Sequence, residues 1–158
     1  MLKPVSQAAP SVTFYVLAEA SDAARLKLAC RIIDKAYRAA QNVLIWHTDP
    51  RELTRLDELL WSSGDDRSFI PHELVSAAHA CEAPVLLTSG AVPEGQIDVL
   101  INLASEIPEC AAQAARIVEI IDGDGARRES GRSRFKTYRE RGLAPVSHNV
   151  GADQPARL

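Results

Sequence analysis

The densest group of charged side chains lies near the C-terminal end, in the stretch ARRESGRSRFKTYRERG. Residues 127–141 hold seven of the 18 Lys and Arg residues against two acids, a net charge of +5 in a chain whose total is −3. The rest of the chain therefore sums to −8. Such a separation of charge along a chain is typical of a surface that binds a partner.

This basic segment is predicted to be a helix, because five of its side chains recur at helical spacing on one side: Arg128, Arg132, Phe135, Lys136 and Arg139. An aromatic ring within a stripe of cations can hold an apolar side chain while the cations bind carboxylates. A peptide with a hydrophobic last residue and a free C-terminal carboxylate fits this chemistry. Phosphates fit it as well, because Lys and Arg neutralise them. A solvated helix with Phe135 turned inward remains an equally open interpretation.

A second candidate surface lies in the stretch WSSGDDRSFIPHEL, residues 61–74. Trp61, Phe69 and Ile70 are bulky apolar groups around an irregular, polar segment. They could plug the core, or they could anchor a partner, since the centres of protein interfaces favour aromatic residues.

The sequence offers no motif for catalysis. GAVPEGQ has two glycines at phosphate-loop spacing, but Gln96 stands where a lysine is needed and Ile97 where Ser or Thr must bind the metal. No glycine follows the first predicted strand, so the dinucleotide-binding fingerprint is absent. His79 and Cys81 lack a second pair at zinc-binding spacing. We therefore expect no catalytic, cofactor-binding or metal-binding residue and no enzyme activity.

Cysteine usage and hydropathy indicate the compartment. Three widely spaced cysteines give no disulfide framework, which favours the reducing cytoplasm. The start of the chain lacks the apolar core of a secretory signal. The longest apolar runs are far short of the ~20 residues that a membrane helix needs.

Strand-like and helix-like segments alternate along the chain. Buried strands are predicted at 12–17, 42–47, 84–89, 97–103 and 117–122. Helices are predicted between them, including a capped one that begins after Asp49 with Pro50 at its first position and a short one after Pro71. This alternation predicts a three-layer α/β/α sandwich with a mostly parallel sheet of about five strands. We expect one domain over residues 12–150, between flexible segments at 1–11 and 151–158.

The order of several short motifs resembles the chi subunit of bacterial DNA polymerase III. The motifs are TFYVL, LACRIIDKAYRAAQNVLIWHTD, LDELLW, SFIPHEL, DVLINL and RFKTYRERG, which together span about residues 12–142. The resemblance implies a nucleotide-binding-like fold without a phosphate loop. It also implies a non-catalytic accessory subunit of the polymerase in DNA replication, which bridges the clamp-loader complex, through the psi subunit, to the C-terminal tail of the single-stranded-DNA-binding protein.

The resemblance also assigns residues to two surfaces. The tail-binding cations of the family fall on Arg128, Arg132 and Lys136, with Phe135 at the aromatic position and Arg139 on the same stripe. The psi-binding aromatic falls on Phe69, with Trp61 and Ile70 nearby. In some chi proteins a helicase takes the psi surface instead.

Two alternatives to the polymerase adaptor stay open. The chain could bind single-stranded nucleic acid directly, or it could serve as a helicase-associated adaptor in DNA repair. The acidic remainder should repel bare DNA, which favours a protein partner and only indirect contact with DNA.

Overall fold

The computed structural model describes residues 9–62, 70–75, 83–90, 92 and 97–150. Its elements, in chain order, are β1 (Ser11–Leu17), α1 (Asp22–Arg38), β2 (Val43–Trp46), α2 (Pro50–Ser62), β3 (His72–Leu74), β4 (Val85–Thr88), β5 (Ile97–Asn102), the 3-10 helix η1 (Glu109–Gln113), β6 (Ala114–Ile121), α3 (Gly125–Glu140) and β7 (Val146–Val150).

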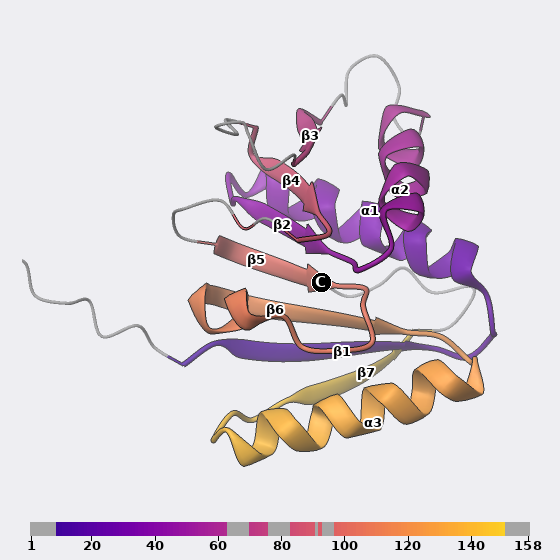
Figure 1. Ribbon diagram of the computed structural model, residues 1–158, viewed down its shortest axis with the longest axis vertical. Coiled ribbons are helices and arrows are strands. Elements are labelled where there is room, and N and C mark those ends of the chain that lie inside the picture. The colour runs from indigo at the N-terminus through magenta and orange to yellow at the C-terminus, as the bar shows by residue number, and fades with distance from the viewer. Residues whose placement is uncertain (1–8, 63–69, 76–82, 91, 93–96, 151–158) are drawn as a thin grey trace, which may run out of the picture.

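The strands form one seven-stranded sheet in the order β3-β4-β2-β5-β6-β1-β7, and every pair is parallel. Helices α1 and α2 pack on one face, and α3 with η1 packs on the other. The three layers are visible in Figure 1, where α2 and β3 lie at one end of the molecule and α3 and β7 at the other. The predicted α/β class and the parallel sheet are confirmed.

The strand count differs from the prediction of about five because both edge strands escaped detection. The first, β3, has only three residues, where the sequence predicted a short helix. The other, β7, is exposed along most of its length and carries polar residues, so it shows no hydrophobic pattern. An edge strand is held by backbone hydrogen bonds to one neighbour, which a hydrophobic pattern does not reveal.

The ends of the predicted domain can be compared only in part. Ser11 already belongs to β1, one residue earlier than predicted, and Val150 ends β7. The segments 1–8 and 151–158, which include most of the predicted flexible ends, lie outside the described residues.

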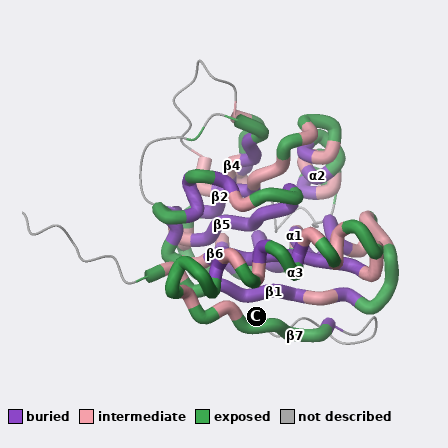
Figure 2. The backbone as a smooth tube through the Cα atoms, turned by 60° about the horizontal axis from the view of Figure 1, so that its bottom comes forward, coloured by how far each residue is buried: buried purple, intermediate pink, exposed green. Residues whose placement is uncertain are grey.

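The hydrophobic core has one part on each face of the sheet. The larger part joins α1 and α2 to the sheet and includes Leu26, Ile33, Leu56 and Ile101. The smaller part lies under α3 and η1 and includes Phe14, Ile117 and Tyr138. Figure 2 shows the central strands β1, β2, β5 and β6 largely buried and β7 largely exposed. Helix α3 packs over β6 and β1, and its opposite side is exposed to solvent.

Candidate protein-binding surfaces

The start of helix α3 is fixed by two local features. Asp124 is its N-cap and accepts a hydrogen bond from the Arg127 backbone N–H at 3.0 Å. Just before it, Gly123 lies against the loop that follows β1, where a Cβ atom would come within 2.5 Å of the Ala18 carbonyl oxygen. A further glycine, Gly131, faces the sheet in the middle of the helix, and a Cβ there would overlap the Ile121 side chain. These contacts hold α3 close to β6 and β1.

Two arginines of α3 are neutralised inside the molecule. Nε and Nη2 of Arg127 each lie 2.7 Å from an oxygen of the buried Asp122 carboxylate. Arg134 is itself buried and places its Nη2 3.0 Å from Glu119 Oε1. The second oxygen of Glu119 accepts hydrogen bonds from the Tyr138 hydroxyl at 2.7 Å and from the Asn102 amide. Neither arginine is therefore a simple surface cation.

The electrostatics of these pairs follow from their surroundings. Hydrogen bonds from Arg127 hold the pKa of Asp122 below its usual value. Burial raises the pKa of Glu119, against the opposing effect of Arg134, Asn102 and Tyr138. Burial also raises the pKa of the Tyr138 hydroxyl, and the neighbouring Glu119 carboxylate raises it further.

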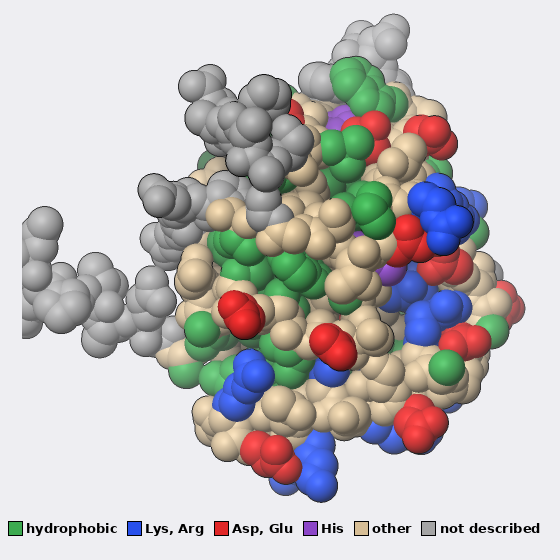
Figure 3. Space-filling model, in the orientation of Figure 1, with side chains coloured by type: hydrophobic (Ala, Val, Ile, Leu, Met, Phe, Trp, Pro, Cys, Tyr) green, Lys and Arg blue, Asp and Glu red, His purple; other side chains and the backbone are tan. Residues whose placement is uncertain are grey.

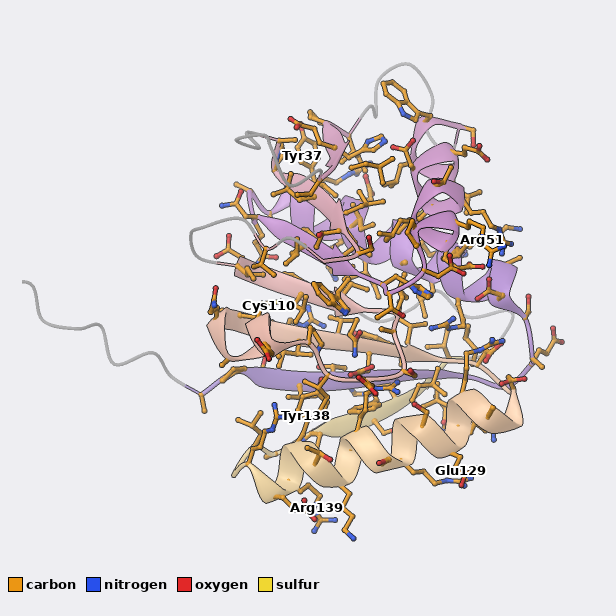
Figure 4. The ribbon with its side chains drawn as sticks, viewed as in Figure 1. Tyr37, Arg51, Cys110, Glu129, Tyr138 and Arg139 are labelled. Atoms are coloured by element: carbon orange, nitrogen blue, oxygen red, sulfur yellow. The ribbon has the colours of Figure 1, made fainter. Side chains whose placement is uncertain are left out.

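The remaining cations of α3 face solvent. Arg132, Lys136 and Arg139 are exposed, and none forms an ion pair with a carboxylate of the described residues. Arg128 is half-buried and donates to the backbone carbonyls of Asp122 and Leu17, at 3.2 and 3.4 Å. It too forms no ion pair with a carboxylate in the part of the chain that the structure describes. Figure 4 shows Arg139 pointing away from the sheet and Tyr138 pointing toward it.

A cavity of about 250 Å³ lies beside these cations, between α3, β1 and β7. Its lining consists of Phe14, Val16, Ile121, Arg128, Gly131, Arg132, Phe135 and Ser147. The rings of Phe14 and Phe135 meet with their centroids 5.1 Å apart. We call this hollow the α3 cavity. Its lining is apolar except for two arginines and a serine.

The structure thus brings together Arg128, Arg132 and Phe135 as the sequence predicted, and it leaves Lys136 and Arg139 on the exposed side of α3, outside the lining. Sequence reasoning missed the part of the cavity that comes from the sheet. Val16 and Ile121 are direct partners in the β1–β6 pairing. Phe14 and Ser147 are direct partners in the β1–β7 pairing. Only the register of strands far apart in the chain could reveal these neighbours.

The second predicted surface is divided by the structure. Trp61, at the end of α2, is 61% exposed. Ile70 is only 6% exposed and packs in the core beside α2, which corrects its assignment to a partner-binding surface. Phe69 lies outside the described residues.

Trp61 rests on a buried histidine that the sequence did not single out. The rings of Trp61 and His72 have their centroids 5.1 Å apart in an edge-to-face arrangement. His72 Nε2 lies 3.0 Å from Asp57 Oδ1, and its Nδ1 lies 2.7 Å from the Ile70 carbonyl oxygen. The burial of His72 could have been predicted only if the residues HEL had first been recognised as a strand.

The carboxyl edge of the sheet is where open α/β folds bind nucleotides. Here a cavity of about 250 Å³ at that edge is lined in part by Arg25, Arg127 and Arg134. Arg25 is buried and donates to the carbonyls of Ile120 and Leu103 and to Asp22. Because Arg127 and Arg134 also have buried carboxylate partners, the cations at this edge are balanced from within the protein.

Within the described ranges, no three His, Cys, Asp or Glu side chains are grouped so that they could hold a metal ion. No helix in those ranges is long and apolar enough to cross a membrane.

The molecule is therefore a three-layer α/β domain in which ion pairs within the protein line the carboxyl edge of the sheet, and α3 presents exposed cations beside an apolar cavity. Its fold is similar to a solved structure of the C-terminal domain of the DEAD-box protein Dbp5, with a TM-score of 0.60 over 94% of this chain and 93% of the other, at 9% identity. Residues 10–146 match the family model of the DNA polymerase III chi subunit, HolC. The chain belongs to this family.

Three relatives carry the same family description. The chain is 37% identical to the DNA polymerase III subunit chi of Pseudomonas aeruginosa, over 88% of this chain and 96% of the relative. It is 29% identical to that of Haemophilus influenzae, over 90% and 99%. It is also 29% identical to that of Escherichia coli, over 84% and 93%.

Proposed function

We propose that this chain is a non-catalytic accessory subunit of DNA polymerase III in the bacterial cytoplasm. It links the clamp-loader complex, through psi, to the C-terminal tail of the single-stranded-DNA-binding protein. Membership of the chi family supports the replication role. The single observation that carries the tail-binding part is the α3 cavity, an apolar hollow bordered by Arg128 and Arg132.

The size and lining of the cavity suit one apolar side chain. Its volume of about 250 Å³ is below the roughly 300–1,000 Å³ of pockets that enclose a drug-sized ligand. Phe14, Val16, Ile121 and Phe135 supply the apolar walls. The last residue of a hydrophobic tail would enter here, and its terminal carboxylate would then lie beside Arg128 and Arg132.

The uncompensated cations outside the cavity extend this surface. Lys136 and Arg139 lie on the exposed side of the same helix, where they would pair with acidic residues upstream in the tail. A single exposed ion pair contributes only roughly 0.2–1 kcal/mol. Binding therefore needs several pairs together with the buried apolar residue, and we expect its affinity to fall as salt rises.

Direct binding of single-stranded nucleic acid is less well supported. Bases bind such proteins largely by stacking on exposed aromatic rings. The ring on the basic surface, Phe135, is half-buried and packs against Phe14 instead. The chain as a whole is also acidic.

The test is a calorimetric titration with a peptide that copies the C-terminal tail of the single-stranded-DNA-binding protein from the same organism. Wild-type protein should bind the peptide, and binding should be lost when the last residue of the peptide is removed. The variant Arg132→Glu/Lys136→Glu should also lose it. A tail peptide that fails to bind wild-type protein at low salt would contradict the proposal.

A matched variant controls for charge alone. Lys27 and Arg31 are exposed on α1 with the same four-residue spacing as Arg132 and Lys136. Lys27→Glu/Arg31→Glu changes the net charge by the same amount on the other face of the sheet. This control should bind the peptide like wild type, and equal weakening in both variants would mean that only the overall charge matters.

We assign the second partner, psi, to the surface around Trp61 and Phe69. Trp61 is exposed at the end of α2, far along the sheet from α3. Phe69→Ala and Trp61→Ala should each abolish co-purification with psi and leave tail binding intact. Loss of both activities in one variant would mean that the substitution damages the fold. A helicase, where present, would compete with psi for this surface.

A further inference from the structure

A second exposed apolar side chain, Leu74, lies on the edge strand against which Trp61 packs. Leu74 of β3 is 46% exposed, one of four large apolar residues that are exposed within the described ranges. Leu74 and His72 are two residues apart in a strand, so their side chains project to the same face of the sheet. Trp61 packs on His72. Trp61 and Leu74 therefore lie on the same side of the sheet edge, with the buried His72 ring beneath Trp61.

The Trp61 ring is supported from below. His72 bridges Asp57 of α2 and the carbonyl of Ile70, so one buried side chain joins the helix to the segment that leads into the edge strand. The Trp61 ring therefore packs against a buried side chain that is held on both sides. An exposed tryptophan held in this way loses less conformational entropy on binding than a free one.

The charge around this apolar pair is negative. Asp57 and Glu58 precede Trp61 by four and three residues on α2, which places them on its side of the helix. The described residues 56–62, 70–75 and 83–90 contain three carboxylates and no Lys or Arg. The nearest cations on the helices, Arg55 and Lys27, line a hollow with Glu58 between α1 and α2. Figure 3 shows acidic and apolar side chains next to one another where α2 and β3 lie.

From this arrangement we infer that the partner segment that docks on Trp61 and Leu74 is cationic as well as apolar. An apolar side chain of the partner packs between Trp61 and Leu74, and a Lys or Arg beside it pairs with Glu58. The inference rests on the proposed function, in which this surface binds psi, and it specifies the chemistry of the segment of psi that makes the contact. The molecule would then have two binding surfaces that prefer partners of opposite charge, because the α3 surface binds acidic segments.

The test is a titration of wild-type protein and two variants with the psi subunit of the same organism, at low and high salt. Glu58→Lys should weaken psi binding about tenfold and make the remaining affinity less sensitive to salt. Leu74→Ser should weaken it by a similar factor at both salt concentrations. The matched controls are Glu129→Lys, an exposed acid on α3, and Val146→Ser, a 49%-exposed valine on the opposite edge strand. Both controls should bind psi like wild type.

The outcomes separate this inference from the function on which it rests. If Trp61→Ala abolishes binding while Glu58→Lys and Leu74→Ser bind like wild type, the inference is wrong and the psi surface stands. An affinity for psi that rises with salt also contradicts the inference. If Trp61→Ala itself binds psi normally, the assignment of this surface to psi is wrong, and the inference falls with it.

Discussion

The absence of a Cβ atom at Gly131 lets α3 pack closely against the sheet and leaves the α3 cavity open. A Cβ at this position would overlap the Cδ1 methyl of Ile121, whose side chain also lines the cavity. The free space beside Ile121 is the cavity itself, so Gly131→Ala should push this methyl into it. We expect the variant to bind the tail peptide about tenfold more weakly. Its unfolding free energy should stay within about 1 kcal/mol of wild type, because alanine also favours the helix.

Gly125 provides the matched control on the same helix. It lies at the first position of α3, and a Cβ there would meet no atom within 4 Å. Gly125→Ala should retain the peptide affinity of wild type in the same titration. If Gly131→Ala also retained it, the last residue of the tail would have to bind somewhere other than the α3 cavity.

Asp122 makes the free energy of unfolding depend on pH. Its pKa is held below the usual 3.8 by Arg127, so the folded state binds a proton less readily than the unfolded chain. The stabilisation from this pair is present above pH 3.8 and is lost as the pH falls through the lower, folded pKa. Asp122→Asn should therefore be less stable than wild type at pH 7, and the gap should narrow below about pH 3.8.

Urea unfolding between pH 7 and pH 3 measures this gap. The comparison variant is Asp34→Asn, which removes an exposed ion pair with Arg38 on α1. An exposed pair contributes little, so this control should stay close to wild type across the range. A gap for Asp122→Asn that widens toward acid would contradict the assigned direction of the pKa change.

At the scale of the element, α3 is tied to the sheet by the buried network around Glu119. Its carboxylate is fully buried and receives donors from Arg134, Tyr138 and Asn102. Glu119→Gln leaves the buried Arg134 guanidinium without its counter-charge. Breaking a buried pair in this way costs about 3–5 kcal/mol, so we expect a large loss in urea-unfolding free energy.

The same substitution at the exposed Glu129 of α3 should change the free energy of unfolding by less than about 0.5 kcal/mol. Tail binding should weaken in Glu119→Gln only through the loss of folded protein. A Glu119→Gln variant as stable as wild type would mean that Arg134 finds another partner and that the network does not hold the helix.

The elements also show which parts of the site the sequence could predict. The stripe of Arg128, Arg132 and Phe135 followed from helical spacing, because 3.6 residues per turn decides which side chains share a face. The same counting could not distinguish Arg127 and Arg134, whose carboxylate partners lie on another element. The sheet walls of the α3 cavity depend on parallel pairing between segments about a hundred residues apart, which a single sequence does not encode locally.

The second surface shows the complementary limit. A bulky apolar residue in an irregular stretch can lie in the core or on the surface, and the pattern alone left both open. The structure placed Ile70 in the core and Trp61 on the surface. His72 lies between the two, because its ring packs against Trp61 and its Nδ1 lies 2.7 Å from the Ile70 carbonyl oxygen.

At the scale of the whole molecule, the two proposed surfaces lie at opposite edges of one sheet. Trp61 lies beside β3, the first strand in the sheet order, and the α3 cavity lies beside β7, the last. Five strands separate them (Figure 1). Sites this far apart that share no contacts are expected to act additively, within about 0.5 kcal/mol. The molecule should therefore hold both partners at once.

Binding of each partner in the presence and absence of the other tests this independence. Trp61→Ala should lose psi and bind the tail peptide like wild type, and Arg132→Glu/Lys136→Glu should do the reverse. Saturating wild-type protein with psi should leave the affinity for the tail peptide unchanged within about twofold. A larger change, in either direction, would mean that the sheet transmits binding between its edges. The proposed bridge between psi and the single-stranded-DNA-binding protein would then be regulated by its own partners and not passive.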